Sequence, residues 1–136
     1  MDHMSDRDAS APVIRMPESG GAQPTARFAA TGGSFSVKEW RGSGPATLHV
    51  HHADDEAWHV LEGTLHFRFA DSEIDVPAGG TIFVPAGVAH TYTATDARYL
   101  IVLTPRLEAL IAELQSNRDP AAQHGIYARH DSTLLE

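Results

Sequence analysis

Between residues 28 and 104 the chain consists of short stretches in which apolar and polar residues alternate. Turn-forming residues recur about every 8 to 12 positions, which is typical of antiparallel β-sandwiches and barrels. Glu62-Gly63 and Ala70-Asp71 have the composition of tight hairpin turns. The pattern predicts eight strands, at residues 34–40, 46–51, 56–61, 64–70, 72–76, 81–84, 90–94 and 98–103.

After Pro105 the period of the pattern changes. Leu107, Leu110, Ile111 and Leu114 recur at spacings of three and four residues, which predicts an amphipathic helix that ends near Asn117. We expect this helix to pack on the barrel or across a dimer interface. A second short helix or turn is expected after Pro120. Residues 124–136 form a C-terminal tail whose structure the pattern leaves open.

The first 27 residues have a different composition, with Pro and Gly among Ser, Ala and Asp. Such a segment cannot bury enough apolar surface to offset its ordering entropy, so we expect a flexible arm, either mobile or laid along a partner subunit. The predicted organisation is an N-terminal arm (1–27), a β-barrel (28–104) and a C-terminal helix and tail (105–136). The fold class is therefore all-β, a small antiparallel β-barrel with a C-terminal helical appendage.

Composition excludes several classes of function. The chain of 136 residues has 10 Lys and Arg against 18 Asp and Glu, a formal net charge of −8, which argues against nucleic acid or an anionic membrane as a partner. It has no Cys, so a metal must be held by His, Asp or Glu. Its apolar runs are far shorter than the ~20 residues of a membrane span, and its acidic start lacks the apolar core of a secretory signal, so we expect a cytoplasmic protein.

Histidines are concentrated where the strands are predicted, with six of the nine between positions 49 and 90. Successive strand residues point to opposite faces, so His49 and His51 share one face. Glu56 opens the returning strand and can face the same point, and a turn at residues 84–87 delivers His90 at the start of another strand. Three imidazoles and one carboxylate suit one divalent transition metal ion (Fe, Mn, Ni, Co, Cu or Zn) and leave positions open for a ligand.

The alternative to a metal site is a polar cluster in the core. Without a metal, each inward polar group would carry a desolvation cost of about 1–3 kcal/mol, so we favour the ligand interpretation. His52, His59 and His66 are instead expected at the surface or at an interface. The candidate pocket residues are Trp58, Val60, Phe67 and Tyr92, although inward aromatic side chains are more often simply core.

At these positions the sequence resembles the cupin superfamily, whose fold is a jelly roll or double-stranded β-helix. The first cupin motif is matched by Gly44, His49, His51, Glu56 and Gly63, and the second by Gly79, Pro85, Gly87 and His90. The 15 residues between Gly63 and Gly79 match the compact spacing of small microbial members. Two positions depart from the motifs: four residues separate Gly44 from His49 where the family has five, and Ala94 replaces the terminal Asn. Residues 48–63 look like those of small bacterial quercetinase-like cupins.

This resemblance implies a range of functions, because cupins include dioxygenases, isomerases, lyases and non-enzymatic proteins. We expect a mononuclear metal-dependent dioxygenase that acts on a small enolic or phenolic, quercetin-like substrate, with Glu56 both as metal ligand and as catalytic base. A redox-neutral isomerase, lyase or cyclase, and a non-catalytic small-molecule-binding cupin, are the alternatives. Small cupins and the unpaired edges of such a barrel also lead us to expect a homodimer.

Overall fold

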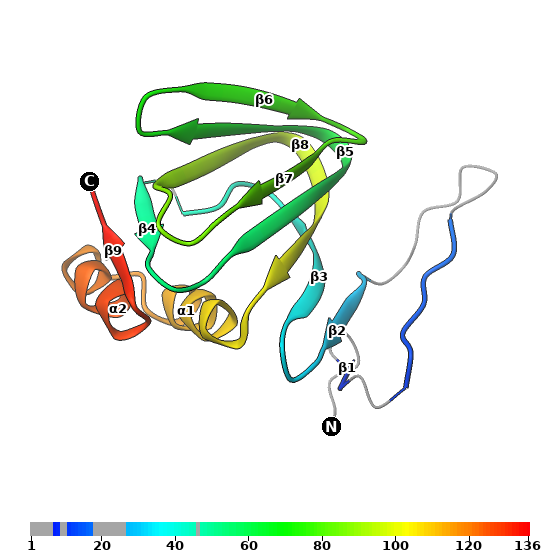
Figure 1. The fold of residues 1–136 in the computed structure, drawn as a ribbon, viewed down its shortest axis with the longest axis horizontal. Coiled ribbons are helices and arrows are strands. Elements are labelled where there is room, and N and C mark those ends of the chain that lie inside the picture. The colour runs from blue at the N-terminus through cyan, green and yellow to red at the C-terminus, as the bar shows by residue number, and fades with distance from the viewer. Residues whose placement is uncertain (1–6, 9–10, 18–26, 46) are drawn as a thin grey trace.

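A computed structural model describes residues 11–17, 27–45 and 47–136, together with the backbone of residues 7–8. The predicted arm, residues 1–27, falls largely outside these residues, as does Ala46 at the start of one predicted strand. In the described part, nine strands form one curled sheet, followed by the expected helical appendage, which confirms the predicted fold class (Figure 1). The strands are β1 (Arg7–Asp8), β2 (Ala29–Thr31), β3 (Ser36–Arg41), β4 (His49–His51), β5 (Glu56–Phe69), β6 (Glu73–Pro77), β7 (Thr81–Val84), β8 (His90–Leu103) and β9 (Ser132–Leu134).

Two 14-residue strands, β5 and β8, pair antiparallel along their length and form the centre of the sheet. The first part of β5 also pairs with β7, and its second part pairs with β6. The other edge of β8 pairs with β3 and with β4. The pairing with β4 joins His49 to His90. The predicted turn at Ala70-Asp71 joins β5 to β6, where the amide of Phe69 donates to the carbonyl of Ser72 at 2.8 Å.

The hairpin predicted at Glu62-Gly63 is wrong, because β5 continues through it. The register with β8 shifts on both sides of Glu62, and Gly63 has a φ of +71°. This irregularity changes which residues point inward: Trp58 and Val60 are buried before it, and Leu65 and Phe67 after it. β8 likewise runs without a break through the predicted gap at 95–97. In sequence, a bulge and a turn both interrupt the alternation, and the pattern alone does not distinguish them.

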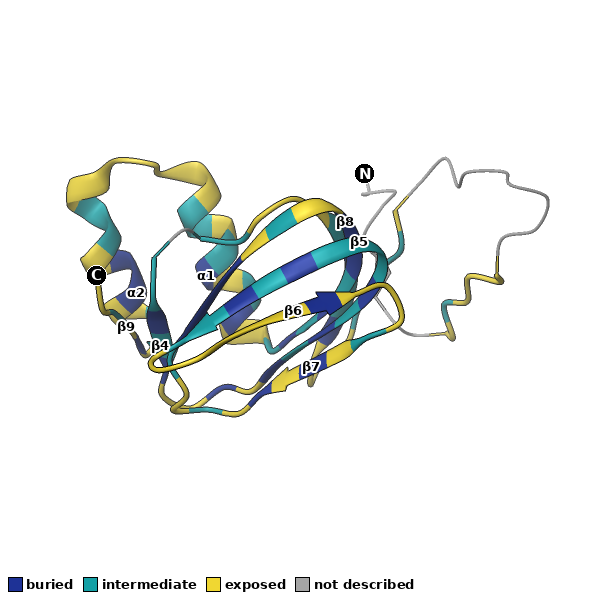
Figure 2. Cartoon of the chain, turned by 90° about the horizontal axis from the view of Figure 1, so that it is seen from above, coloured by how far each residue is buried: buried dark blue, intermediate teal, exposed yellow. Residues whose placement is uncertain are grey.

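The core lies between the two halves of the curled sheet (Figure 2). Its largest cluster is aromatic: the ring centroid of Phe67 is 4.8 Å from that of Trp58 and 5.1 Å from that of Tyr92. The Tyr99 hydroxyl donates to the carbonyl of Gly42 at 2.8 Å and accepts from the Tyr92 hydroxyl at 2.9 Å. Both tyrosines therefore stay in the core with their polar atoms paired.

The C-terminal part folds back on the sheet. Helix α1 (Pro105–Ser116) is capped by Thr104, whose side chain accepts a hydrogen bond from the amide of Leu107. The helix ends before Asn117, as predicted. The short helix or turn expected after Pro120 is present as η1 (Pro120–Ala122), and helix α2 (Gln123–Arg129) follows it directly. The tail therefore holds two elements that the pattern does not predict, most of α2 and the strand β9, which pairs with β4. No helix among the described residues is long and apolar enough to cross a membrane.

Candidate metal centre

The predicted ligands converge at the end of the barrel where β4, β5 and β8 meet. His49 and His51 lie on β4, His49 pairs with His90 across to β8, and Glu56 begins β5. All four side chains are buried, with exposed fractions of 1–7%. One nitrogen from each of the three His rings lies within 4.8 Å of the others, so these three buried His could hold a metal ion.

In each of the three His rings, a hydrogen bond at Nδ1 fixes the direction in which Nε2 points. Nδ1 of His49 is 2.9 Å from the carbonyl oxygen of Thr47, and Nδ1 of His90 is 2.9 Å from that of Val88. A carbonyl only accepts, so both rings carry a proton on Nδ1 and direct Nε2 inward. Nδ1 of His51 lies 2.8 Å from the Ser132 hydroxyl, which itself donates to the carbonyl of His130. These two hydrogen bonds place the proton of His51 on Nδ1 as well. A second ring nitrogen held by a hydrogen bond is usual for metal-binding imidazoles.

Glu56 supplies a negative charge beside these ring nitrogens. Its Oε1 is 3.2 Å from Nε2 of both His51 and His90. Burial raises the pKa of Glu56, but the contacts with His51 and His90 outweigh it and lower the pKa to about 2. Burial, together with the neighbouring His90, lowers the pKa of His49 to about 4. One carboxylate beside three imidazole nitrogens is a donor set that fits a divalent cation.

Loops on either side of the ligands are tied to one another. Gly87, with a φ of +90°, donates its amide to the carbonyl of His51 at 2.7 Å, and the Asp55 carboxylate accepts from the amide of Ala86. The turn before His90 is thereby held against the loop before Glu56. Asp55 therefore connects two parts of the site.

Next to the ligands is a small cavity of about 30 Å³. Trp58 and Tyr92, two of the candidate pocket residues, are among the residues that line it. Val60 and Phe67 are fully buried, but neither is among the described residues that line this cavity. A volume of this size holds about one water molecule, so the body of any substrate must lie elsewhere.

Sequence reasoning did not assign the wall formed by the helices. Leu107, Leu110, Ile111 and Leu114 of α1 line the small cavity, and Tyr127 of α2 packs its ring 5.4 Å from that of His49. The helical spacing of the leucines predicted a packed face, but not that this face covers the histidines. Ser132 was also missed, because nothing in the tail links it to His51, 81 residues away.

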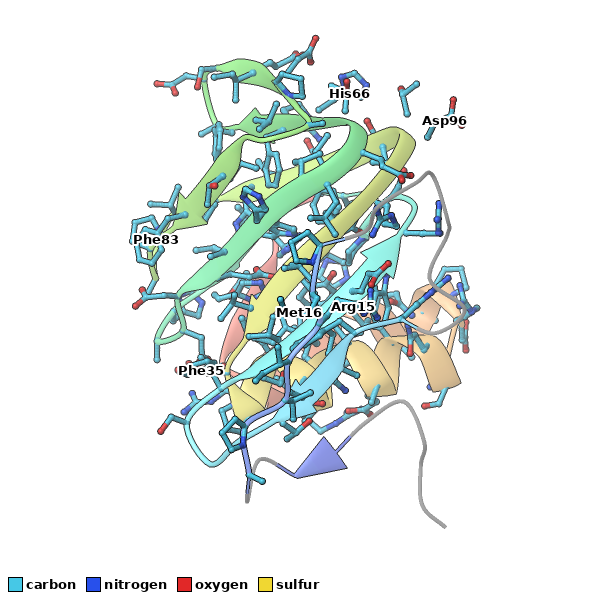
Figure 3. All side chains as sticks on the ribbon, turned by 90° about the vertical axis from the view of Figure 1, so that its right-hand side faces the viewer. Arg15, Met16, Phe35, His66, Phe83 and Asp96 are labelled. Atoms are coloured by element: carbon cyan, nitrogen blue, oxygen red, sulfur yellow. The ribbon has the colours of Figure 1, made fainter. Side chains whose placement is uncertain are left out.

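The other three histidines of the region lie outside the site. His52 contacts the Thr133 hydroxyl, His59 that of Thr81, and His66 lies between Asp75 and Thr95. Figure 3 shows His66 at the periphery of the molecule, on the same side as Asp96. These residues provide controls for the buried set.

Comparison with known proteins agrees with this geometry. The family model described as "Cupin_2: Cupin domain" matches residues 37–104, which is half of the chain. An uncharacterized protein of Streptomyces coelicolor is 36% identical over 56 residues, which cover 40% of this chain and 53% of the relative. The match thus spans about half the length of that curated relative.

Solved structures with a similar fold include two described as cupins. A cupin-2 domain containing protein of Shewanella frigidimarina is 28% identical, with a TM-score of 0.48 over 62% of this chain and 83% of that one. A cupin protein of Bacteroides fragilis is 16% identical, also with a TM-score of 0.48, over 67% of this chain and 86% of that one.

Proposed function

From the premise that this chain belongs to the Cupin_2 family of cupin domains, we propose that it is a mononuclear metal-dependent dioxygenase. Its ligands would be His49, His51, His90 and Glu56, and its substrate a small enolic or phenolic molecule. The observation that supports this most directly is the common tautomer of the three rings, each held through Nδ1 with Nε2 directed inward. Bound there, a redox-active divalent ion would supply the reaction with dioxygen.

The charge of the ligand set favours an acidic substrate. Three neutral imidazoles and one carboxylate leave a divalent centre with a net charge of +1. This charge attracts an enolate or phenolate oxygen more strongly than a neutral sugar hydroxyl. The site therefore selects a substrate that can lose a proton near neutral pH.

Glu56 is the residue placed to take that proton. Its Oε1 faces the same point as the imidazole nitrogens, and a carboxylate that leaves the metal can accept a proton from a substrate bound there. Trp58 and Tyr92, with Leu107 and Leu110 of α1, form an apolar wall that keeps bulk water away. Burial raises the pKa of Tyr92 to about 12, so its hydroxyl stays neutral beside the carboxylate.

Oxygen dependence tests this proposal. Metal-loaded protein, with the metal identified by elemental analysis, is incubated with a panel of flavonols, catechols and enolic diketones. We expect substrate loss matched by oxygen consumption, no turnover under argon, and loss of at least ~100-fold in rate in Glu56→Ala with metal resupplied, while His59→Ala stays active. Turnover that continues without oxygen would replace the proposal by a redox-neutral isomerase, lyase or cyclase. Binding without conversion would indicate a non-catalytic cupin.

We also propose a homodimer in which a second subunit covers apolar side chains that the arm and the sheet leave exposed. Ile14 and Met16 are apolar yet 76% and 72% exposed, and Phe35 is 54% exposed. Arg15 and Met16 lie against the outer side of β3 and β8, where Arg15 pairs with the buried Glu39 at 3.1 Å (Figure 3). A second subunit would cover this apolar surface. Light scattering of the full chain at micromolar concentration should give twice the monomer mass, and a monomer would contradict the proposal.

A further inference from the structure

A larger cavity lies beside the metal centre, between the β3–β4 segment and the helical appendage. Its volume is about 370 Å³, within the range of sites for small organic molecules. It shares part of its wall with the 30 Å³ cavity at the ligands, including Tyr92, Ile111, Leu114 and Tyr127. A molecule in the larger cavity would therefore lie next to the metal centre, with apolar and aromatic side chains around it.

The charge on this wall differs from that of the rest of the chain. Although acidic residues outnumber basic ones by 18 to 10, none of the described residues that line the cavity is acidic, and Arg118 is the one cation among them. Arg118 makes no hydrogen bond or ion pair within the described part of the chain. The carboxylate next to it, Asp119, already accepts from the amide of Ala121 at 3.0 Å. The guanidinium is thus available to an anion.

The loop that carries Arg118 is held from both sides. The side-chain amide of Gln123 donates to the carbonyl of Asn117 at 3.1 Å and to that of Asp119 at 2.9 Å. The amide of Asn117 donates to the carbonyl of Glu113 at the end of α1. Because both of its neighbours are anchored, the backbone of Arg118 is fixed at the cavity. A backbone fixed in this way removes part of the entropic cost of binding a carboxylate there, compared with an arginine on a free loop.

We propose that this cavity binds the body of the substrate and that Arg118 selects molecules with a carboxylate at the end remote from the metal. The substrate class is then an aromatic or enolic carboxylic acid, with its acidic hydroxyl at the metal and its carboxylate on the guanidinium. This inference rests on the proposed function for the metal end of the substrate. Trp40 and Tyr127, on the cavity wall, provide flat surfaces for the ring between the two ends.

Calorimetric titration of the metal-loaded protein with two related probes tests this. The probes are 6-hydroxy-2-naphthoate and 2-naphthol, which share the ring and the phenol and differ in the remote carboxylate. Wild-type protein should bind the carboxylate about tenfold more tightly. In Arg118→Gln this preference should disappear with the affinity for 2-naphthol unchanged, whereas Arg118→Lys should keep part of it. Added salt should reduce the preference, because the guanidinium is exposed.

Arg41→Gln is the matched control, because Arg41 is an exposed arginine outside the cavity wall, and it should keep the full preference. Equal affinities of wild-type protein for the two probes, a preference that survives in Arg118→Gln, or no binding of either probe would each overturn the inference. Its failure is separable from that of the proposed function. Oxygen-dependent turnover without a carboxylate preference refutes the role of Arg118 alone, and an Arg118-dependent preference without any turnover refutes the dioxygenase alone.

Discussion

His51→Ala should lose most of its metal, from about one transition metal ion per chain in the purified wild-type protein to less than about a tenth of that. His51 contributes one of the three converging imidazoles, and its Nε2 lies 3.2 Å from Oε1 of Glu56. Removal of the ring leaves two imidazoles and one carboxylate and opens the site to water. Elemental analysis after dialysis against a weak chelator measures the effect, and circular dichroism confirms that the variant is folded.

Two further variants make this result specific. His59→Ala removes an imidazole from the same region, but one that contacts the Thr81 hydroxyl away from the site, and it should keep its metal. Ser132→Ala keeps all four ligands but removes the partner of His51 Nδ1, and it should weaken metal affinity about 10- to 100-fold. Equal metal loss in His51→Ala and His59→Ala would refute the ligand assignment.

Gly63→Ala should destabilise the fold by about 2–5 kcal/mol, measured as the free energy of unfolding in urea. Gly63 has a φ of +71°, a backbone conformation that costs about 1–2 kcal/mol for other residues. An added Cβ would also lie 2.6 Å from the carbonyl oxygen of Thr95 and closer still to that of Asp96. These are backbone atoms of β8 and cannot turn aside, so the two central strands would have to separate, at a further cost of about 1–3 kcal/mol.

Gly79→Ala separates these two causes. Gly79 has a similar φ of +92°, but a Cβ there would meet no other described atom within 4 Å. It should therefore cost only about 1–2 kcal/mol, the backbone contribution alone. Equal destabilisation by the two substitutions would show that the contact with β8 contributes nothing and that the backbone conformation explains the whole effect.

Features that depend on near neighbours in the chain were predicted correctly from the sequence. The period of two placed His49 and His51 on one face, and Trp58 and Val60 on the inner face of the returning strand. The period of three to four predicted α1 and its end near Asn117. These rules succeed because side-chain direction in a strand or helix is set by local backbone geometry, which a few consecutive residues determine.

Features that depend on distant parts of the chain were decided by the tertiary structure. Gly63 interrupts the alternation, and only the presence of β8 opposite makes the interruption a bulge and not a hairpin. Ser132 orients His51 because β9 pairs with β4, and Arg118 reaches the larger cavity because α1 and α2 fold across the end of the barrel. The sequence alone thus determined which side chains share a face and which chemistry they carry. The tertiary structure decided what covers them and what holds them in place, because these contacts join residues whose separation along the chain leaves no periodic signal.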